Sequence, residues 1–188
     1  MTSLNPDFAE RLQRVEDQLA IAQLPVRYAM AIDQRDLDAW VNLFVEDVVV
    51  TPNEVGRGPL RDLIAGYVQN FYRSTHFIAG HRIELVDEET AVGNVYCRAE
   101  HEVADRWVVM AIRYDDRYRK VDNQWFFASR KEEHWYAADL LERPQDVGFC
   151  GWDAVPAPRL PQRGVQWKDY WEGRPTAGVT GHPTSQPG

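Results

Sequence analysis

The chain has 188 residues and a formal net charge of −8, and 44% of its residues are hydrophobic and 27% charged. This composition is ordinary for a globular domain long enough to bury a sizeable core. The basic residues are scattered and form no basic stripe, so we expect no nucleic-acid partner. No apolar run approaches the roughly 20 residues of a membrane-spanning helix, so we expect no membrane partner either.

Cysteine usage and the N-terminus bear on where the protein works. Cys97 and Cys150 lie far apart and form no CxxC motif, so a disulfide scaffold is not expected. The first residues show no basic region followed by an apolar stretch, which a secretory signal would require. We therefore expect a cytoplasmic protein.

The first 46 residues have the periodicity of helices. Pro25 predicts a kink, or the first turn of a second helix that runs to Ile32. Asp36 is the predicted N-cap of a further short helix. An apolar stripe recurs at steps of three and four residues, which is typical of an amphipathic helix. Its members are Leu12, Val15, Leu19, Ala22 and Val26.

A change of pattern follows. Residues 48–51 are predicted to form a short strand, residues 56–59 a turn, and residues 60–71 a helix. Four long strands are predicted over residues 76–86, 90–103, 107–120 and 124–136, with polar turns at 87–89 and 121–123. Helices followed by an antiparallel meander indicate an α+β fold.

The chain is divided accordingly. Residues 1–138 are predicted to form one α+β domain. Residues 139–175, rich in Pro and Trp, are predicted to form an irregular arm that packs on the domain or on a neighbouring subunit. Residues 176–188 are predicted to be disordered.

Three side chains are predicted to meet in one cavity. Asp33 ends an apolar helical run, His76 opens a strand, and His101 closes the next strand. A carboxylate fixes the tautomer of an imidazole, raises its basicity and stabilises the imidazolium. A second histidine can then return the proton elsewhere on a substrate. This set is suited to eliminating water from a small organic molecule.

Neighbouring positions supply further candidates. Strand alternation places Cys97 on the same face as His101, and Ile78 on the same face as His76, so both are candidate substrate contacts. Tyr28 precedes Asp33 by five residues, so on an ideal helix it points well away from Asp33, and only a kink or a wide cavity brings both to one substrate. Tyr114 and His134 are further candidates, either as cavity lining or as core filling.

Other interpretations of these residues stay open. Any single interior histidine is most simply a structural residue. Two histidines and a carboxylate can also hold a divalent metal, but no HExxH or His-x-His motif is present, so neither a metal nor another cofactor is expected. A Ser–His–Asp triad is disfavoured because no serine lies in a nucleophile-elbow context.

The chain resembles the SnoaL-like group of the nuclear transport factor 2-like superfamily over roughly residues 15–140. The residues that carry the resemblance are Tyr28, Asp33, Asp36, Phe44 and Asp47, then the stretches 76–101 and 118–125. It implies a cone-shaped curved antiparallel sheet packed on N-terminal helices, with a deep pocket.

Within that group the helix Asp and the two strand histidines resemble those of scytalone dehydratases. Tyr28, Asp33 and His76 are similar to the Tyr–Asp–His set of bile acid 7α-dehydratases, and Asp33 with His76 to the dyad of hexachlorocyclohexane dehydrochlorinases. A residue before the helix Asp departs from the scytalone dehydratase pattern, because Ile32 stands where that family has tyrosine. Scytalone itself is therefore not the expected substrate.

The resemblance implies a cofactor-independent lyase, most directly a dehydratase, acting on a small, largely apolar ring compound. His76 would abstract the proton, His101 would protonate the departing hydroxyl, and Tyr28 would hydrogen-bond the carbonyl or the leaving group. The alternatives are an isomerase or carbon–carbon lyase with the same base, or a non-catalytic ligand-binding module or dioxygenase β-like subunit. A homo-oligomer, trimer or dimer, is expected from the same relatives.

Overall fold

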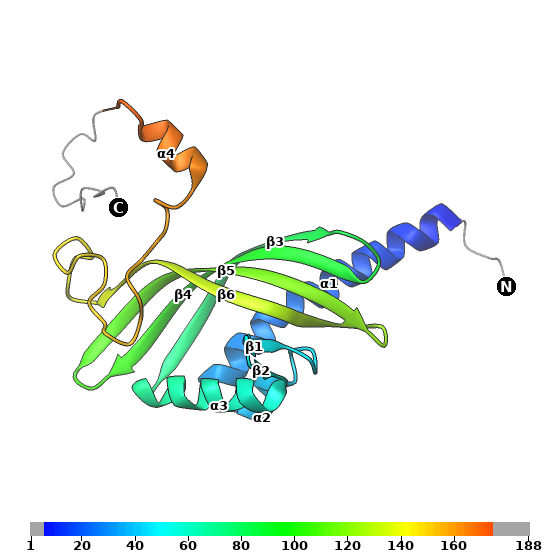
Figure 1. The fold of residues 1–188 in the computed structure, drawn as a ribbon, viewed down its shortest axis with the longest axis horizontal. Coiled ribbons are helices and arrows are strands. Elements are labelled where there is room, and N and C mark those ends of the chain that lie inside the picture. The colour runs from blue at the N-terminus through cyan, green and yellow to red at the C-terminus, as the bar shows by residue number, and fades with distance from the viewer. Residues whose placement is uncertain (1–5, 175–188) are drawn as a thin grey trace.

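The computed structural model describes residues 6–174. A helical segment comes first and a sheet follows (Figure 1). The helical segment consists of α1 (Pro6–Asp33), α2 (Leu37–Val41), the hairpin strands β1 (Val49–Thr51) and β2 (Glu54–Val55), α3 (Arg57–Tyr67) and the 3-10 turn η1 (Val68–Asn70). The rest comprises β3 (Ser74–Leu85), β4 (Thr90–Val103), β5 (Arg106–Val121), β6 (Gln124–Asp139) and α4 (Val165–Trp171).

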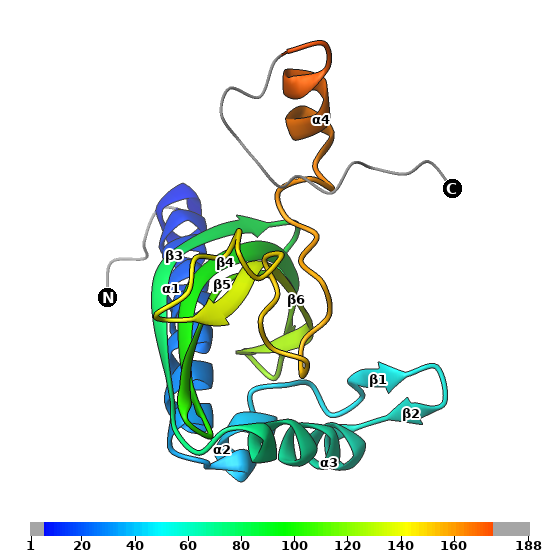
Figure 2. The same cartoon turned by 90° about the vertical axis from the view of Figure 1, so that its left-hand side faces the viewer.

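The predicted antiparallel meander is confirmed. The four long strands pair in the order β3-β4-β5-β6 and form an open, curved sheet. Helix α1 packs against β3 and β6, and α3 lies across from the sheet beside α2 (Figure 2). The predicted α+β class and the helix-covered curved sheet are therefore correct.

Turn chemistry fixes the register of the meander. Asp122 and Asn123 form the two-residue loop between β5 and β6, and both have positive φ values, 48° and 61°. Such a loop matches the twist of the flanking strands, and Asp and Asn tolerate its left-handed backbone. Between β3 and β4, the Asp87 side chain accepts hydrogen bonds from the backbone N–H groups of Glu89 and Thr90.

Two apolar clusters make up the core. One lies where α1 and α2 meet the sheet and includes Ile21, Trp40 and Phe127. The other lies along β4 and β5 and includes Val95 and Met110, with further members from the arm. The cavity described below lies between residues of these two clusters, so the core supplies its rigid apolar walls.

Helix α1 differs from its prediction in two ways. It runs without interruption through Pro25, whose ring is fully buried in the core. Moreover, the predicted apolar stripe stays exposed, and Leu19 is 62% exposed. The opposite stripe, which includes Ile21 and Leu24, packs on the sheet instead. Both sides of the helix are apolar, so periodicity alone does not say which side the sheet covers.

Smaller differences lie at element ends. The strands begin or end up to three residues from their predicted bounds, which is the usual uncertainty of such boundaries. Helix α3 begins at Arg57, inside the predicted turn, and the short strand β2 was not predicted. The predicted arm is irregular up to Gly164 but then forms α4.

The division of the chain into a domain, an arm and a tail stays a prediction. The first part of the arm packs on the domain, because Trp152 belongs to the second core cluster. The predicted disordered tail, with His182, lies outside the described residues. None of the helices in the described part of the chain is both long and apolar enough to cross a membrane.

Candidate active site

Asp33 and His76 form a hydrogen-bonded pair where α1 ends and β3 begins. The Asp33 Oδ1 atom lies 2.7 Å from His76 Nδ1, and Asp33 Oδ2 accepts the His76 backbone N–H at 2.9 Å. A carboxylate next to Nδ1 accepts a hydrogen bond from the Nδ1–H group, which leaves Nε2 as the basic nitrogen. Burial tends to raise the pKa of Asp33, but the hydrogen bonds from His76 and Ser74 outweigh it and hold the pKa below its ordinary value.

Arg35 holds the Asp33–His76 pair in position through hydrogen bonds to the segments that carry it. It has a positive φ of 61°, so the chain turns back sharply after α1. Its guanidinium donates to the carbonyl of Ile32 and to Ser74 Oγ, and Ser74 Oγ donates onward to Asp33 Oδ1 at 2.8 Å. It also donates to the carbonyls of Phe71 and Tyr72. The end of α1 and the start of β3 are thereby joined, so the dyad is held by rigid elements.

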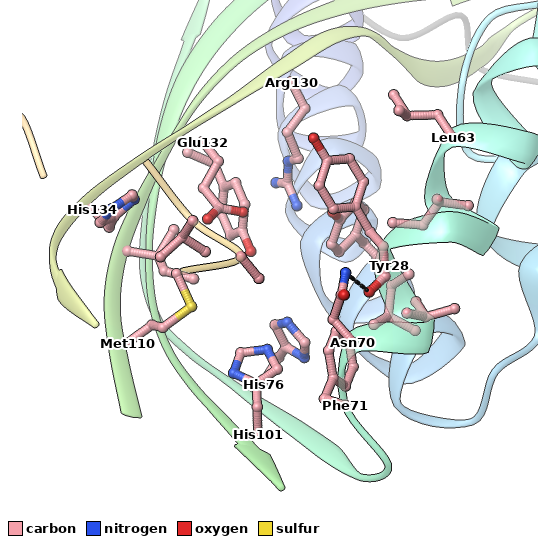
Figure 3. A pocket seen from close by; sticks show the side chains of 18 of the residues that line it. Tyr28, Leu63, Asn70, Phe71, His76, His101, Met110, Arg130, Glu132 and His134 are labelled. Atoms are coloured by element: carbon pink, nitrogen blue, oxygen red, sulfur yellow. Dashed lines mark hydrogen bonds between the residues drawn. The ribbon is translucent and has the colours of Figure 1, made fainter. Parts of the chain in front are cut away.

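His76 faces a cavity of about 390 Å³, a size suited to a small organic ligand. Figure 3 shows side chains converging on it from the helices and from the sheet. Most of the lining is apolar, from α3 (Leu60, Leu63, Ile64), β5 (Met110, Ile112) and the arm (Trp152, Ala154, Val155). Asp33 is not part of the lining, so it acts on a ligand only through His76.

His101 lies beside His76 but in a different environment. The two imidazole centroids are 5.6 Å apart, and the ring planes are nearly perpendicular. The rings of Phe71 and Trp152 pack against His101 at 4.7 and 5.1 Å, and its Nδ1 is buried without a hydrogen-bond partner in the described chain. Burial, and then the positive charge that His76 can carry, lower the pKa of His101 to about 3.

This environment bears on the predicted role of His101 as an acid. A lowered pKa favours the neutral imidazole, which is a weaker proton donor than the imidazolium. His101 lines the cavity and is placed to hydrogen-bond a ligand, and its role as an acid stays a prediction.

Tyr28 reaches the cavity because the cavity is wide, while α1 remains continuous. Its ring packs 5.5 Å from Trp40 and 5.8 Å from Tyr114. Burial raises the pKa of Tyr28 to about 12, so its hydroxyl keeps its proton and can donate a hydrogen bond. Tyr114 also lines the cavity, as expected.

Arg130 is a cavity residue that the sequence analysis did not single out. Its guanidinium lies 4.2–4.4 Å from the ring centres of Tyr28, Tyr114 and Phe127. Asp116 accepts two hydrogen bonds from it, at 2.8 and 2.7 Å. Burial would lower the pKa of Arg130, but Asp116 holds it above its ordinary value. The cavity thus has one fixed cation in its wall.

Glu132 and His134 follow Arg130 on the same face of β6. His134 lines the cavity, as expected, and its Nε2 lies 2.6 Å from the carbonyl oxygen of Pro156, so it also ties the arm to the sheet. Glu132 lines the cavity as well, and the sequence analysis missed it. The signal was available, since alternate residues of a strand share a face and His134 was already a candidate.

Two predicted substrate contacts do not reach the cavity lining. Cys97 is buried in the second core cluster, and burial raises the pKa of its thiol to about 12. Ile78 packs against the same cluster. Neither residue is among those that line the cavity. Within residues 6–174, no group of three or more His, Cys, Asp and Glu side chains is arranged to hold a metal ion.

The fold and its largely apolar cavity define a class, namely a helix-covered curved sheet that binds a small molecule. Residues 13–131 match the SnoaL-like domain family. This match covers more than half of the chain, and the protein belongs to that family. The resemblance drawn from the sequence is thereby confirmed. The chain has no match among the curated proteins.

Solved structures agree with this assignment. A protein of Novosphingobium aromaticivorans DSM 12444, provisionally named a scytalone dehydratase, is 25% identical over 70% of this chain and 92% of that chain, with a TM-score of 0.60. Hexachlorocyclohexane dehydrochlorinase LinA-type3 of Novosphingobium barchaimii LL02 is 18% identical over 71% of this chain and 96% of that chain, with a TM-score of 0.63. At that identity the second likeness shows the fold alone.

Proposed function

We propose that this protein is a cofactor-independent lyase, most directly a dehydratase. The observation that carries the proposal is the Asp33–His76 hydrogen bond of 2.7 Å, with His76 facing an apolar cavity. An imidazole oriented by a carboxylate is an effective general base near neutral pH. The name of one similar structure, a provisional scytalone dehydratase, supports elimination as the reaction class.

In this proposal His76 Nε2 removes a proton from the carbon next to a substrate carbonyl. The electrons form an enolate, and the hydroxyl on the next carbon leaves as the double bond forms. Asp33 stabilises the imidazolium that His76 becomes, because its negatively charged carboxylate already accepts a hydrogen bond from the Nδ1–H group. General base catalysis of this kind typically contributes about 10²–10⁴-fold in rate.

The substrate carbonyl is polarised by Tyr28 and Arg130. The Tyr28 hydroxyl remains protonated, and its ring stacks close to the Arg130 guanidinium in the cavity wall. A fixed cation and a hydrogen-bond donor stabilise the negative charge that develops on an enolate oxygen. Because Asp116 holds Arg130 in place, this stabilisation needs no reorganisation during the reaction.

The walls of the cavity suggest the substrate class. Aromatic and aliphatic side chains dominate the lining, and the volume of about 390 Å³ fits a compact ring system. We therefore propose a small cyclic, largely apolar hydroxy-carbonyl compound of aromatic, polyketide, terpenoid or steroid-like character.

The first test uses the purified, metal-free protein in D₂O with a panel of cyclic β-hydroxy ketones, followed by mass spectrometry. Loss of one water, absent with His76→Ala, is the expected result. Deuterium uptake next to the carbonyl without loss of water would instead favour an isomerase that uses the same base. Saturable binding with neither change would contradict a lyase and favour a binding module.

A further inference from the structure

Elimination of hydroxide needs an acid as well as a base. The base is accounted for by His76, whereas burial lowers the pKa of the neighbouring His101 and so disfavours the protonated form that would donate a proton. Hydroxide is a poor leaving group, so a lyase of this kind needs a group that donates a proton to the departing oxygen. The carboxyl of Glu132 lines the cavity, has suitable chemistry and has no role assigned so far.

Glu132 lies on β6 directly opposite Tyr114 of β5, between Arg130 and His134 in the alternation of the strand. Its side chain is accessible from the cavity and forms part of its lining. Figure 3 shows Glu132 and Arg130 on one side of the cavity, with His76 and His101 toward the other. A substrate held between these sides meets the imidazole base and the carboxyl at once.

The carboxyl of Glu132 is also left without a protein partner. Among residues 6–174 it makes no hydrogen bond or ion pair. Arg130, on the same face of the strand, donates two hydrogen bonds to Asp116, while its Nη1 atom is buried without a partner in the described chain. Glu132 itself is accessible at the cavity wall, so its unpartnered carboxyl is available to a ligand.

We propose, on the basis of the lyase function proposed above, that Glu132 is the catalytic acid that protonates the departing hydroxyl of the substrate. As His76 Nε2 takes the proton from carbon, the C–O bond breaks and its electron pair stays on oxygen. The O–H proton of Glu132 passes to that oxygen, and water leaves. The imidazolium proton then returns to the Glu132 carboxylate through water in the emptied cavity, which restores both groups.

The electrostatics of the cavity favour Glu132 as the acid beside His76 as the base. Removal of bulk water raises the pKa of Glu132, against the opposing effects of His134, His76 and Arg130. Asp33 and His101 shift in the opposite direction. A raised pKa favours the protonated carboxyl of Glu132, which is the form that can donate a proton. The other ionisable groups that line the same cavity are Tyr28, Tyr67, His76, His101, Tyr114, Arg130 and His134.

The first experiment needs no substrate. Infrared spectra of the full chain are recorded from pH 5 to 8 for the wild type, Glu132→Gln and Glu133→Gln. The neighbouring Glu133 is a matched control, because it is ion-paired with Lys131 and Arg163 and its pKa is lowered. We expect a carboxylic-acid C=O band that persists above the ordinary range of glutamate, is absent in Glu132→Gln and remains in Glu133→Gln. Absence of such a band in the wild type would overturn the inference.

The second experiment separates the acid from the base. Turnover of β-hydroxytetralone is compared with turnover of its β-acetoxy ester, because acetate leaves without being protonated. Glu132→Gln should reduce elimination of water by roughly 10²–10⁴-fold but elimination of acetate only a few-fold, whereas His76→Ala should reduce both. Equal losses for both substrates, or no loss, would refute the acid assignment while leaving the lyase intact. If the wild type eliminates neither leaving group, the proposed function fails and the acid assignment fails with it.

Discussion

His76 and His101 lie with their imidazole centroids 5.6 Å apart, yet only His76 is paired with a carboxylate. Asp33 supports a positive charge on His76, while Phe71 and Trp152 enclose His101 in apolar surroundings. Two residues of the same type thus acquire different properties from their neighbours. One is equipped to take a proton and the other to remain neutral.

The Asp33 carboxylate is expected to be essential for activity. In Asp33→Asn an amide replaces the acceptor of the Nδ1 proton, so the His76 tautomer is no longer fixed. We expect turnover to fall by roughly 10²–10⁴-fold in steady-state assays while the circular dichroism spectrum is retained. Asp105→Asn, in the exposed loop between β4 and β5, is the control and should keep full activity. Full activity in Asp33→Asn would remove the basis for the dyad.

Buried neutral His101 should make stability depend on pH. Its pKa is about 3 in the folded protein and about 6.5 when unfolded, so between these values only the unfolded state binds the proton. Stability therefore falls as the pH falls below 6.5. His101 alone should lower the free energy of unfolding by on the order of 2 kcal/mol between about pH 7 and pH 5.

Urea denaturation of the wild type and His101→Gln at both pH values checks this expectation. The variant should lose less stability between them than the wild type does. Asp33 does not interfere in this window, because its lowered pKa affects stability only below its ordinary value of 3.8. Equal losses for the two proteins would show that His101 is not held neutral.

Removal of Asp116 should destabilise the fold strongly. The side chains of Asp116 and Arg130 are 0% and 4% exposed, so Asp116→Ala leaves a buried guanidinium without its partner. Loss of one partner of a buried ion pair typically costs about 3–5 kcal/mol. The free energy of unfolding in urea measures it, with Asp38→Ala as control. The Asp38 side chain is 77% exposed and its ion pair with Arg61 lies at the surface, so its removal should change stability far less.

The exposed stripe of α1 bears on self-association. It consists of Phe8, Leu12, Val15, Leu19, Val26 and Met30. We propose that a second copy of the chain covers this stripe, which is apolar over much of the helix length. Leu19→Glu should then reduce the molar mass measured by light scattering to that of one chain, whereas Gln18→Glu, beside the stripe, should not. A wild type that is monomeric across the measured concentrations would contradict this proposal.

Much of the site could be predicted from the sequence, because consecutive strands of the sheet are also neighbours in space. Adjacent strands of a meander must pair, so His76 and His101 near neighbouring strand ends were bound to approach each other. The acidic residue at the end of α1 followed from the same geometry, since a helix that packs on the sheet ends near its edge.

Other features depend on tertiary structure that no local pattern reveals. Arg35 acts through carbonyl groups of Phe71 and Tyr72, which only the folded chain brings to it. The pairing of Arg130 with Asp116 likewise exists only once the strands of the sheet have come together. The choice between the two apolar sides of α1 is likewise made by the sheet and not by the helix.

Helix α3 gives the cavity an unusual wall. None of its residues is buried, although Leu60, Leu63, Ile64 and Tyr67 all face the cavity. Leu60 and Ile64 are only partly buried against the first core cluster, so a ring compound that fills the cavity adds apolar contacts to this helix. Ligand binding and the packing of α3 are therefore linked equilibria, and a ligand at 100 times its Kd should add about 2.7 kcal/mol to the stability of the fold. A bound substrate therefore extends the hydrophobic core for as long as it occupies the cavity.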